Sequence, residues 1–430
     1  METIAAVVAA FKLPDLRRKI LLTLGILVIY RFAAHIPVPG VDLEALRITF
    51  QQSRLLGLLD MFSGGAMSNF SIVAMGVYPY ITASIIMQLV APMIPRLQEL
   101  QREGEAGRNQ LNRYTHLMTV PLAVLQGYGQ VFFLTQTSPP VLTEWGFTGA
   151  ALLPTVATLA TLTAGTMFAL WLGELITENG IGNGVSIIIF GGIVANMPQR
   201  VGIDLATNIP GLVAFMLVAV VTVAAIVVIY EGQRRIPVQY GKRVRGTRVY
   251  GGQSTHIPLR VNSAGMIPLI FASSLLILPG VISQYFLSST SSIVAGVASL
   301  AFNLVNTQEV YYWIVYFLMV VGFTYFYTSV IFQQQNIPEN LQRQGGFIPG
   351  IRPGVRTAEY LTRVLNRITL VGALFLGTVA ILPFFLQGIT SQQTLIISST
   401  GLLIVVGVVI DTMKQLEAQL LMRHYEGFLK

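Results

Sequence analysis

The sequence of 430 residues contains no cysteine, and only 11% of its residues are charged. The absence of cysteine excludes disulfide bonds and thiolate chemistry. About a quarter of the residues of soluble globular proteins are charged, so the low fraction argues against that class. Hydrophobic residues make up 53% of the chain and form continuous runs, whereas a membrane β-barrel would show alternating segments of ~10 residues. The composition therefore predicts an all-α polytopic membrane protein.

Patterns typical of catalysis or cofactor binding are also scarce. The 4 histidines lack the spacing of a metal site or of a Ser/His/Asp triad. No G-x-x-x-x-G-K-[ST] motif occurs, so the chain is not expected to hydrolyse a nucleotide through a P-loop. A G-x-G-x-G stretch at 180–184 does not follow a predicted strand and is better explained as a hinge at the start of a helix. We expect no enzymatic activity, no metal and no cofactor.

Ionisable side chains are nearly absent from the long hydrophobic runs. Those that occur lie at or near the ends of runs: Arg31, His116, Glu174, Glu309 and Asp411. A proton- or sodium-coupled transporter normally carries carboxylates near the middle of the membrane. A small-solute transporter with inverted repeats is therefore a weaker alternative. A non-transporting insertase or scaffold, which would contain no aqueous path, is a third.

The hydrophobic runs predict ten transmembrane helices with both termini in the cytoplasm. The predicted spans are 20–36, 72–95, 114–136, 150–173, 183–199, 209–230, 262–287, 307–332, 365–387 and 394–412. The termini and loops of one side hold 23 basic residues, and the opposite side holds 3. Such asymmetry identifies the cytoplasmic side. It also accounts for the net charge of +8, so no direct nucleic-acid function is predicted from the charge.

Five spans in each half make the second half, 201–430, enter the membrane inverted relative to the first, 1–200. Inverted halves related by an axis in the membrane plane are a known way to build a pathway at their interface. The two halves have no convincing sequence identity. The repeat is therefore predicted from topology alone.

The stretch 55–94 combines an apolar half-segment with a full-length apolar run. Residues 72–94 are free of charge and long enough to cross a hydrocarbon core of ~30 Å. Residues 55–70 are too short to cross, contain Asp60 and are interrupted by Gly64-Gly65. A broken segment leaves backbone groups unpaired in lipid, so it persists only when buried in protein or lining an aqueous cavity. The pattern predicts an internal cavity that this half-segment occupies.

Two predicted cytoplasmic loops, 231–260 and 333–367, are longer than a connection between spans requires. In the first, VQY and TRVYG flank a turn at Arg245-Gly246, as in a β-hairpin. In the second, prolines and glycines fix a turn that presents basic residues outward. These residues could serve topology alone, although a short loop with two or three Lys or Arg would be enough for that. The other interpretation is a docking surface for an acidic or RNA-bearing cytosolic partner.

A series of sequence segments, distributed in order over the whole chain, resembles the SecY/Sec61-alpha family, the channel subunits of Sec protein translocons. The matching segments are HIPVPGVD (35–42), MFSGGAMS (61–68), EGEAGRNQ (103–110), GELITENGIGNGVSIIIF (173–190), EGQRRIPV (231–238), QSTHIPLRVNSAGMIPLIFASS (253–274), GFIPGIRPG (346–354) and LLIVVGVVID (402–411). The resemblance implies a protein-conducting channel whose two halves form a clamshell around a central pore. It would open across the membrane for secreted polypeptides and sideways into lipid for membrane segments.

The resemblance also implies a plug and an apolar pore ring. The segment 55–70 would be the plug, with Asp60, Met61, Phe62, Ser63, Gly64, Gly65, Ala66 and Met67 at its centre. By motif position, the ring would consist of Val77, Ile81, Val185, Ile189, Ile270 and Ile404. The residues themselves show only two i,i+4 apolar pairs, each on one helix face. Without the resemblance, such pairs would be expected to face lipid or a neighbouring helix.

A lateral gate between the second and seventh spans is implied as well, with the polar residues Thr82, Gln88, Asn262 and Ser273. These residues could equally be ordinary hydrogen-bonding contacts between helices.

The resemblance also implies a docking surface for cytosolic partners. Arg352, within GIRPG, matches the family arginine that serves the cytosolic partner. Weaker docking candidates are Arg356, Arg343, Arg243 and Arg248. The implied partners are the SecE and SecG subunits, the SecA ATPase, the ribosome including its RNA, signal sequences, nascent polypeptides and lipid. The implied location is the bacterial cytoplasmic membrane.

Overall fold

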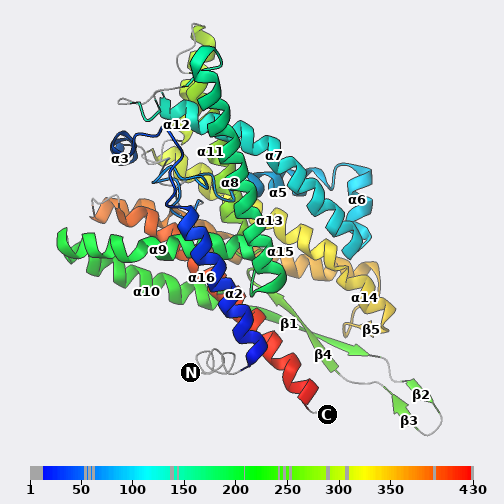
Figure 1. The fold of residues 1–430 in the computed structure, drawn as a ribbon. Coiled ribbons are helices and arrows are strands. Elements are labelled where there is room, and N and C mark those ends of the chain that lie inside the picture. The colour runs from blue at the N-terminus through cyan, green and yellow to red at the C-terminus, as the bar shows by residue number, and fades with distance from the viewer. Residues whose placement is uncertain are drawn as a thin grey trace. The chain divides into compact units, whose positions relative to one another are not determined.

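The structure is a computed structural model, shown as a ribbon in Figure 1. It describes residues 13–427 except 53–55, 57–59, 61–62, 136–139, 143–144, 208, 241–242, 246–247, 251–253, 287–290, 306–308 and 391–393, and some further side chains are not described. The helices are α2 (Pro14–Ala33), α3 (Leu43–Gln52), α5 (Tyr78–Val90), α6 (Pro95–Arg102), α7 (Glu105–Thr135), η1 (Gly149–Ala151), α8 (Leu152–Asn179), α9 (Gly184–Thr207), α10 (Ile209–Glu231), α11 (Ile267–Phe286), α12 (Ser292–Val305), α13 (Val310–Gln335), α14 (Ile337–Arg343), α15 (Val355–Thr390) and α16 (Thr394–Gly427). The strands are β1 (Gln233–Tyr240), β2 (Arg243–Arg245), β3 (Arg248–Tyr250), β4 (Ser254–Arg260) and β5 (Gly346–Phe347).

Long apolar helices dominate the chain, which confirms the prediction of an α-helical polytopic membrane protein. In the part of the chain that the structure describes, five helical stretches are long and apolar enough to cross a membrane. They are Glu105–Thr135, Gly149–Asn179, Ile209–Glu231, Val310–Arg343 and Val355–Leu382. Shorter apolar helices cover Gly184–Gln199, Ile267–Leu276 and Ser292–Ala301. The total of ten spans stays a prediction.

The prediction of one continuous span over 72–95 was wrong. Residues 72–77 form consecutive turns, and α5 begins only at Tyr78. Gly76 has a φ of +51°, which a right-handed helix does not contain, and Pro79 lies in the first helical turn, where its missing N–H is tolerated. After Val90 the chain bends by 104° into α6. The 13 residues of α5 therefore cover only about 20 Å, less than a hydrocarbon core of ~30 Å.

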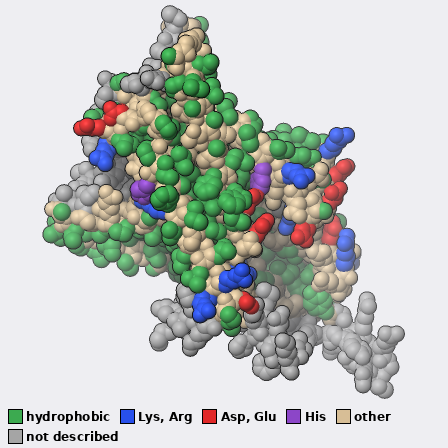
Figure 2. All heavy atoms as spheres, viewed as in Figure 1, with side chains coloured by type: hydrophobic (Ala, Val, Ile, Leu, Met, Phe, Trp, Pro, Cys, Tyr) green, Lys and Arg blue, Asp and Glu red, His purple; other side chains and the backbone are tan. Residues whose placement is uncertain are grey.

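The surface of α8 suits an apolar environment. Figure 2 shows hydrophobic side chains over the region where this helix lies. Leu153, Val156 and Trp171 are more than half exposed there. Large exposed apolar patches on a protein mark contact with a membrane or with another protein. The exposure follows from the sequence, because α8 is apolar all round rather than on one face.

The chain folds as two compact units. The first contains residues 1–219, 273–312 and 383–430, and the second contains 220–272 and 313–382. The boundaries of these units differ from those of the predicted halves, 1–200 and 201–430. The two halves remain a prediction.

In the first unit, the N-terminal part of the chain packs against its C-terminal helix. Leu16 of α2, Ile181 and Leu416 of α16 form one buried cluster. Helix α16 also packs along α9. The two described ends of the chain are thereby brought to the same end of this unit (Figure 1).

The second unit contains a β-ribbon built from the loop 231–260. Strand β1 pairs antiparallel with β4, with Ile236 opposite Ile257, and beyond them β2 pairs with β3 (Figure 1). Arg245 on β2 lies opposite Arg248 on β3, so the predicted hairpin is confirmed. The VQY segment belongs to β1 and pairs with β4 rather than with the TRVYG segment.

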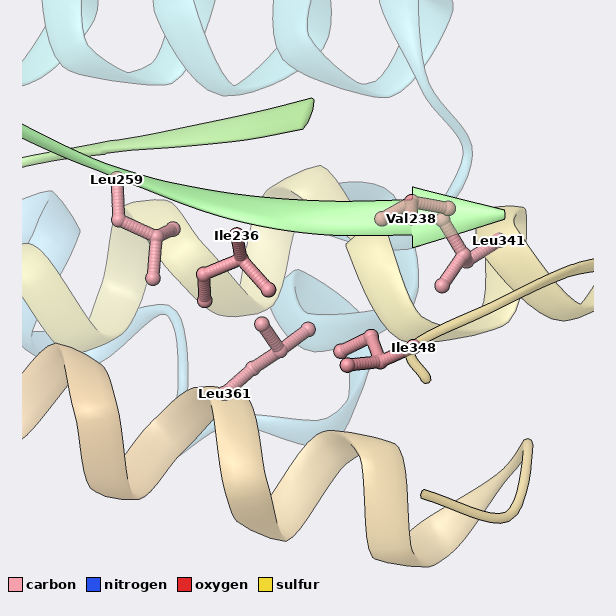
Figure 3. Packing of buried hydrophobic residues seen from close by; sticks show 6 residues of the cluster. All are labelled: Ile236, Val238, Leu259, Leu341, Ile348 and Leu361. Atoms are coloured by element: carbon pink, nitrogen blue, oxygen red, sulfur yellow. The ribbon is translucent and has the colours of Figure 1, made fainter. Parts of the chain in front are cut away.

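The two long loops share one hydrophobic core. The short strand β5, from the loop 333–367, pairs with the end of β1. Six buried side chains from both loops converge beneath the ribbon (Figure 3): Ile236, Val238, Leu259, Leu341, Ile348 and Leu361. The loops that were predicted as separate connections therefore fold together.

Replacing Leu361 by alanine should loosen this core. The side chain is completely buried, and truncation of a buried leucine costs about 2–5 kcal/mol of unfolding free energy. The matched control is Val355→Ala on the same helix, since Val355 is 75% exposed. We expect trypsin to cleave the loops 231–260 and 333–367 at least about tenfold faster in L361A than in wild type or V355A, because cleavage follows local opening. Equal rates in all three proteins would contradict a shared core.

Candidate functional site

The described second part of the half-segment predicted to occupy a cavity, residues 63–70, is largely buried and non-helical. Residues 63–70 form consecutive turns rather than a helix. Ser63, Ala66 and Met67 are at most 1% exposed, and Asp60 is 5% exposed. Two predicted plug residues, Met61 and Phe62, lie outside the described residues. Burial within protein is the condition under which irregular backbone is tolerated at membrane depth.

The carboxylate and backbone of Asp60 form hydrogen bonds within the predicted plug, called the plug below. Its Oδ1 accepts a hydrogen bond from the backbone N–H of Ser68 at 2.8 Å, and its carbonyl accepts one from the N–H of Gly65 at 2.8 Å. The Ser63 hydroxyl donates to the same carbonyl and accepts from the N–H of Met67. These bonds satisfy polar groups that would otherwise be buried without partners.

Two consecutive glycines make the tight turn of the plug possible. Gly64 and Gly65 have φ values of +65° and +82°, in the left-handed region that residues with a Cβ rarely adopt. The turn also lies close to other chain segments. A Cβ at Gly192 of α9 would collide with the backbone of Gly64, so both positions require glycine.

Helix α2 holds this turn through two hydrogen bonds, and a third bond joins α2 to α9 beside the turn. The Tyr30 hydroxyl donates to the carbonyl of Ser63 at 2.6 Å. The Arg31 guanidinium donates from Nη1 to the carbonyl of Gly64 at 3.1 Å and from Nη2 to Oδ1 of Asn196 at 2.8 Å. Sequence reasoning missed Tyr30 and Asn196, and it treated Arg31 only as an unusual charge within the first span. The signal that could have identified the contact was the charge of Arg31 within an apolar run, together with a Gly-Gly break 33 residues later whose backbone carbonyls need hydrogen-bond donors.

The backbone after the plug is paired with the segment that follows α2. The N–H of Val38 donates to the carbonyl of Phe70, and the N–H of Ile72 donates to the carbonyl of Ile36. Pro37 and Ser71 form an isolated antiparallel bridge. The plug is thus hydrogen-bonded to its surroundings at both ends of the segment 63–72.

The predicted ring residues lie on four helices or at their starts. Val77 caps the start of α5 and Ile81 lies one turn later, Val185 and Ile189 are on α9, Ile404 is on α16, and Ile270 is on α11 in the second unit. Five of the six side chains are buried, and Val185 is half-buried. Burial is expected both for a closed constriction and for ordinary helix packing. The ring therefore stays a prediction.

Two hydrogen bonds connect the region of the predicted lateral gate to its neighbours. The amide of Gln126 on α7 donates to the hydroxyl of Thr82 on α5 at 3.2 Å. The Tyr78 hydroxyl on α5 donates to the carbonyl of Ser274 on α11 at 3.2 Å, next to the predicted Ser273. The structure thus brings the second and seventh predicted spans together, through a tyrosine that sequence reasoning missed.

The other two predicted gate residues make local contacts. Gln88 donates to the hydroxyl of Ser84 on its own helix. Asn262, in the second unit, donates to the carbonyl of Gly265 in a turn. The side-chain oxygens of Gln88 and Asn262 are buried without a hydrogen-bond partner in the structure. Each could accept a hydrogen bond after a rearrangement.

Three arginines of the second unit line one hollow of about 640 Å³. Arg352 and Arg356 are exposed and share it with Arg363, Glu359 and Tyr360. Arg356, Glu359, Tyr360 and Arg363 recur at helical spacing on one face of α15. The cationic hollow suits a carboxylate or phosphate group of a partner.

The remaining docking candidates lie elsewhere in this unit. Arg343 is highly exposed, and its Nη2 is 3.8 Å from Oε2 of Glu339. Arg243 and Arg248 begin the paired strands β2 and β3, and their side chains lie outside the described part of the structure. The structure therefore brings two of the five predicted docking arginines together.

The residues of these sites favour positioning and sealing over bond chemistry. Among the described residues no group of three or more His, Asp or Glu could hold a metal ion. His116 of α7 lies 3.0 Å from Glu174 of α8, and its ring is 5.7 Å from that of Tyr80. This polar contact links neighbouring helices of the first unit.

Known proteins resemble this chain over nearly its whole length. A model of the family described as SecY matches residues 71–413. The protein translocase subunit SecY of Streptomyces coelicolor is 45% identical over 443 residues, which cover 99% of this chain and 100% of the relative.

Two solved structures share the fold. One was reported under the statement that the plug domain of the SecY protein stabilises the closed state of the translocation channel; its TM-score is 0.60, with 17% identity over 94% of this chain and 92% of the other. The other is Sec61 in the canine ribosome-channel complex, with a TM-score of 0.60 and 15% identity over the same shares. With a family match over most of its length and a relative at 45% identity over nearly all of it, the chain belongs to the SecY family.

Proposed function

We propose that this chain is a protein-conducting channel of the bacterial cytoplasmic membrane. It passes unfolded secretory polypeptides across the membrane and releases membrane segments sideways into lipid. The observation that carries the proposal is the buried, irregular turn of residues 63–70, which α2 holds by two hydrogen bonds and which Arg31 connects to Asn196 of α9. Irregular backbone in an apolar part of the chain persists only where it is buried in protein or lines an aqueous cavity, and a segment that seals a channel meets this condition.

The pore is sealed by the plug together with the apolar ring. Val77 and Ile81 belong to the start of α5, directly after the plug, and Val185 and Ile189 share one face of α9. A constriction of branched apolar side chains excludes water and ions by dewetting, and it binds a passing polypeptide weakly because it offers no hydrogen bonds. The predicted members Ile270 and Ile404 complete the ring in this proposal.

Sideways release takes place between the second and seventh spans. The contact between Tyr78 and Ser274, and that between Thr82 and Gln126, are hydrogen bonds of neutral groups. Such bonds within membrane proteins contribute about 0.6 kcal/mol on average. The binding of an entering hydrophobic segment can therefore outweigh their loss. Gln88, Asn262 and Ser273 supply further polar groups along the same gate.

The energy for transport comes from a partner, since the sequence has no P-loop. The SecA ATPase or the ribosome docks on the basic loops, with Arg352 and Arg356 at the centre of the surface. Partner and signal sequence bind the open state more tightly and so shift the population toward it. The ribosome complex of the Sec61 structure supports this assignment. SecE and SecG subunits, expected from the family resemblance, brace the two halves, 1–200 and 201–430.

Both termini are cytoplasmic in this proposal. The packing of Leu16 near Leu416 supports placing them on one side, as an even number of spans requires. The alternative of a small-solute transporter is less favoured, because among the described residues no carboxylate cluster provides an ion site.

Conductance of the purified protein in planar bilayers tests the channel directly. The wild type should be silent, and deletion of residues 60–68 should produce a large, steady ion conductance because the seal is lost. Ile81→Asn should raise the leak as well, since an amide in the ring allows water to enter. If both variants were inserted in the bilayer and still silent, the protein would contain no plugged aqueous path.

Charge reversal at the basic hollow tests partner docking. Arg352→Glu should reduce SecA- or ribosome-dependent transport at least about tenfold, because one attractive contact with the partner becomes repulsive. Arg47→Glu, an exposed arginine of α3, changes the net charge equally and should leave transport unchanged. Both variants should show the wild-type melting temperature. Normal transport by R352E would remove this residue from the docking surface.

A further inference from the structure

We infer that Arg31 and Asn196, together with Tyr30, form a latch that holds the plug in its closed position. This inference rests on the proposed channel function and adds positioning residues for its gating. The latch consists of two bonds to the turn, from Tyr30 Oη to the carbonyl of Ser63 and from Arg31 Nη1 to the carbonyl of Gly64, and a third bond from Arg31 Nη2 to Oδ1 of Asn196. The guanidinium thus bridges α2, the plug and α9.

The environment of Arg31 argues against a role in topology alone. The residue lies in the last turn of α2, where an arginine ordinarily extends its head group toward water at the membrane surface. Here the side chain is half-buried, and two of its nitrogens are directed to oxygens of other segments. A half-buried arginine is stable only if its donors are satisfied, and the plug carbonyl supplies one of the acceptors.

The plug seat, formed by Gly192 and Asn196 of α9, also fits the turn sterically. Gly192 and Asn196 are separated by one helical turn of α9 and lie on the same face. The glycine allows the backbone of Gly64 to approach, and a Cβ at position 192 would overlap it. One turn further along, Asn196 receives the guanidinium that clamps the turn. Gly192 therefore provides the space for the turn, and Asn196 fixes the arginine that binds it.

The same face of α9 continues into the predicted pore ring. Val185, Ile189, Gly192 and Asn196 fall within about 60° of one another at 100° per residue. Along this face the two ring candidates come first, and the plug seat follows one to two turns later. This order places the latched turn next to the constriction that it is proposed to seal.

The chemistry of the latch makes it reversible. Both acceptors of Arg31 are neutral oxygens, of a backbone carbonyl and an amide, rather than a buried carboxylate. Hydrogen bonds from a charged donor to neutral acceptors are stronger than neutral pairs but can be exchanged for water. When the plug leaves, Arg31 regains hydration, and no unpaired buried anion remains. A buried ion pair at this position would be far harder to open.

Conductance of latch variants tests the inference. Asn196→Ala and Arg31→Gln should each raise the open probability of the otherwise silent channel about tenfold or more, since a hydrogen bond to a charged group changes an equilibrium by roughly that factor. Arg18→Gln is the matched control, because Arg18 is an exposed arginine of the same helix. It should remain silent.

Gly192→Ala provides an independent steric test that does not remove a charge. Alanine favours a helix more than glycine does, so α9 by itself should become more stable. The new Cβ nevertheless displaces the plug turn, and the leak should rise. A merely structural glycine would give the opposite result: a higher melting temperature and an unchanged, silent channel.

Combination with the plug deletion separates the latch from general damage. If Arg31 acts through the plug, R31Q should add no leak to the protein that lacks residues 60–68, so the two effects are not additive. A further leak in the combined variant would overturn the latch. If the deletion alone conducts while N196A and R31Q stay silent and folded, the latch is wrong and the channel assignment stands. If the deletion itself is silent, the proposed function fails first.

Discussion

Backbone hydrogen bonding within a stretch that is not helical is the constraint on which this structure depends. Residues 63–77 lie in an apolar part of the chain, and unpaired N–H and C=O groups are costly there. The structure supplies partners from outside the segment: Tyr30 and Arg31 on α2, the backbone of residues 36–38, and Asp60 within the proposed plug itself. The positions of α2 and α9 around the plug follow from this requirement.

Sequence reasoning identified the elements whose signal is local. The half-length of 55–70, the Gly-Gly break and the turn at Arg245-Gly246 are all readable from composition and spacing, and the hairpin was confirmed. The start of α5 at Tyr78 was missed, because hydropathy does not distinguish a buried turn from a helix in a charge-free run. The helix α12 was missed since it is too short for a span and carries no charge.

The contacts of the site were unpredictable for a different reason. Arg31 and Asn196 are 165 residues apart, and nothing local connects them. A single sequence carries no record of which distant residues approach each other. Likewise, pairing of β5 with β1 joins two loops that the sequence presents as independent connections. The resulting core under the ribbon gives the basic residues a rigid support, which favours rapid and specific docking over a flexible loop.

The hydrogen bonds described above for the proposed plug and gate join two neutral groups or one charged and one neutral group, and their strength explains why. Moving a two-state equilibrium from 1:99 to 99:1 requires about 5.5 kcal/mol of differential binding. Neutral hydrogen bonds within membranes contribute about 0.6 kcal/mol each, and those with one charged partner about 1.5–3 kcal/mol. A few such bonds, at Tyr78, Thr82 and Arg31, add up to a closed-state preference of that order. A docking partner can break these bonds one at a time, whereas a buried ion pair must be broken in a single step that costs about 3–5 kcal/mol. A gate that opens in every transport cycle therefore needs several weak contacts in place of one strong one.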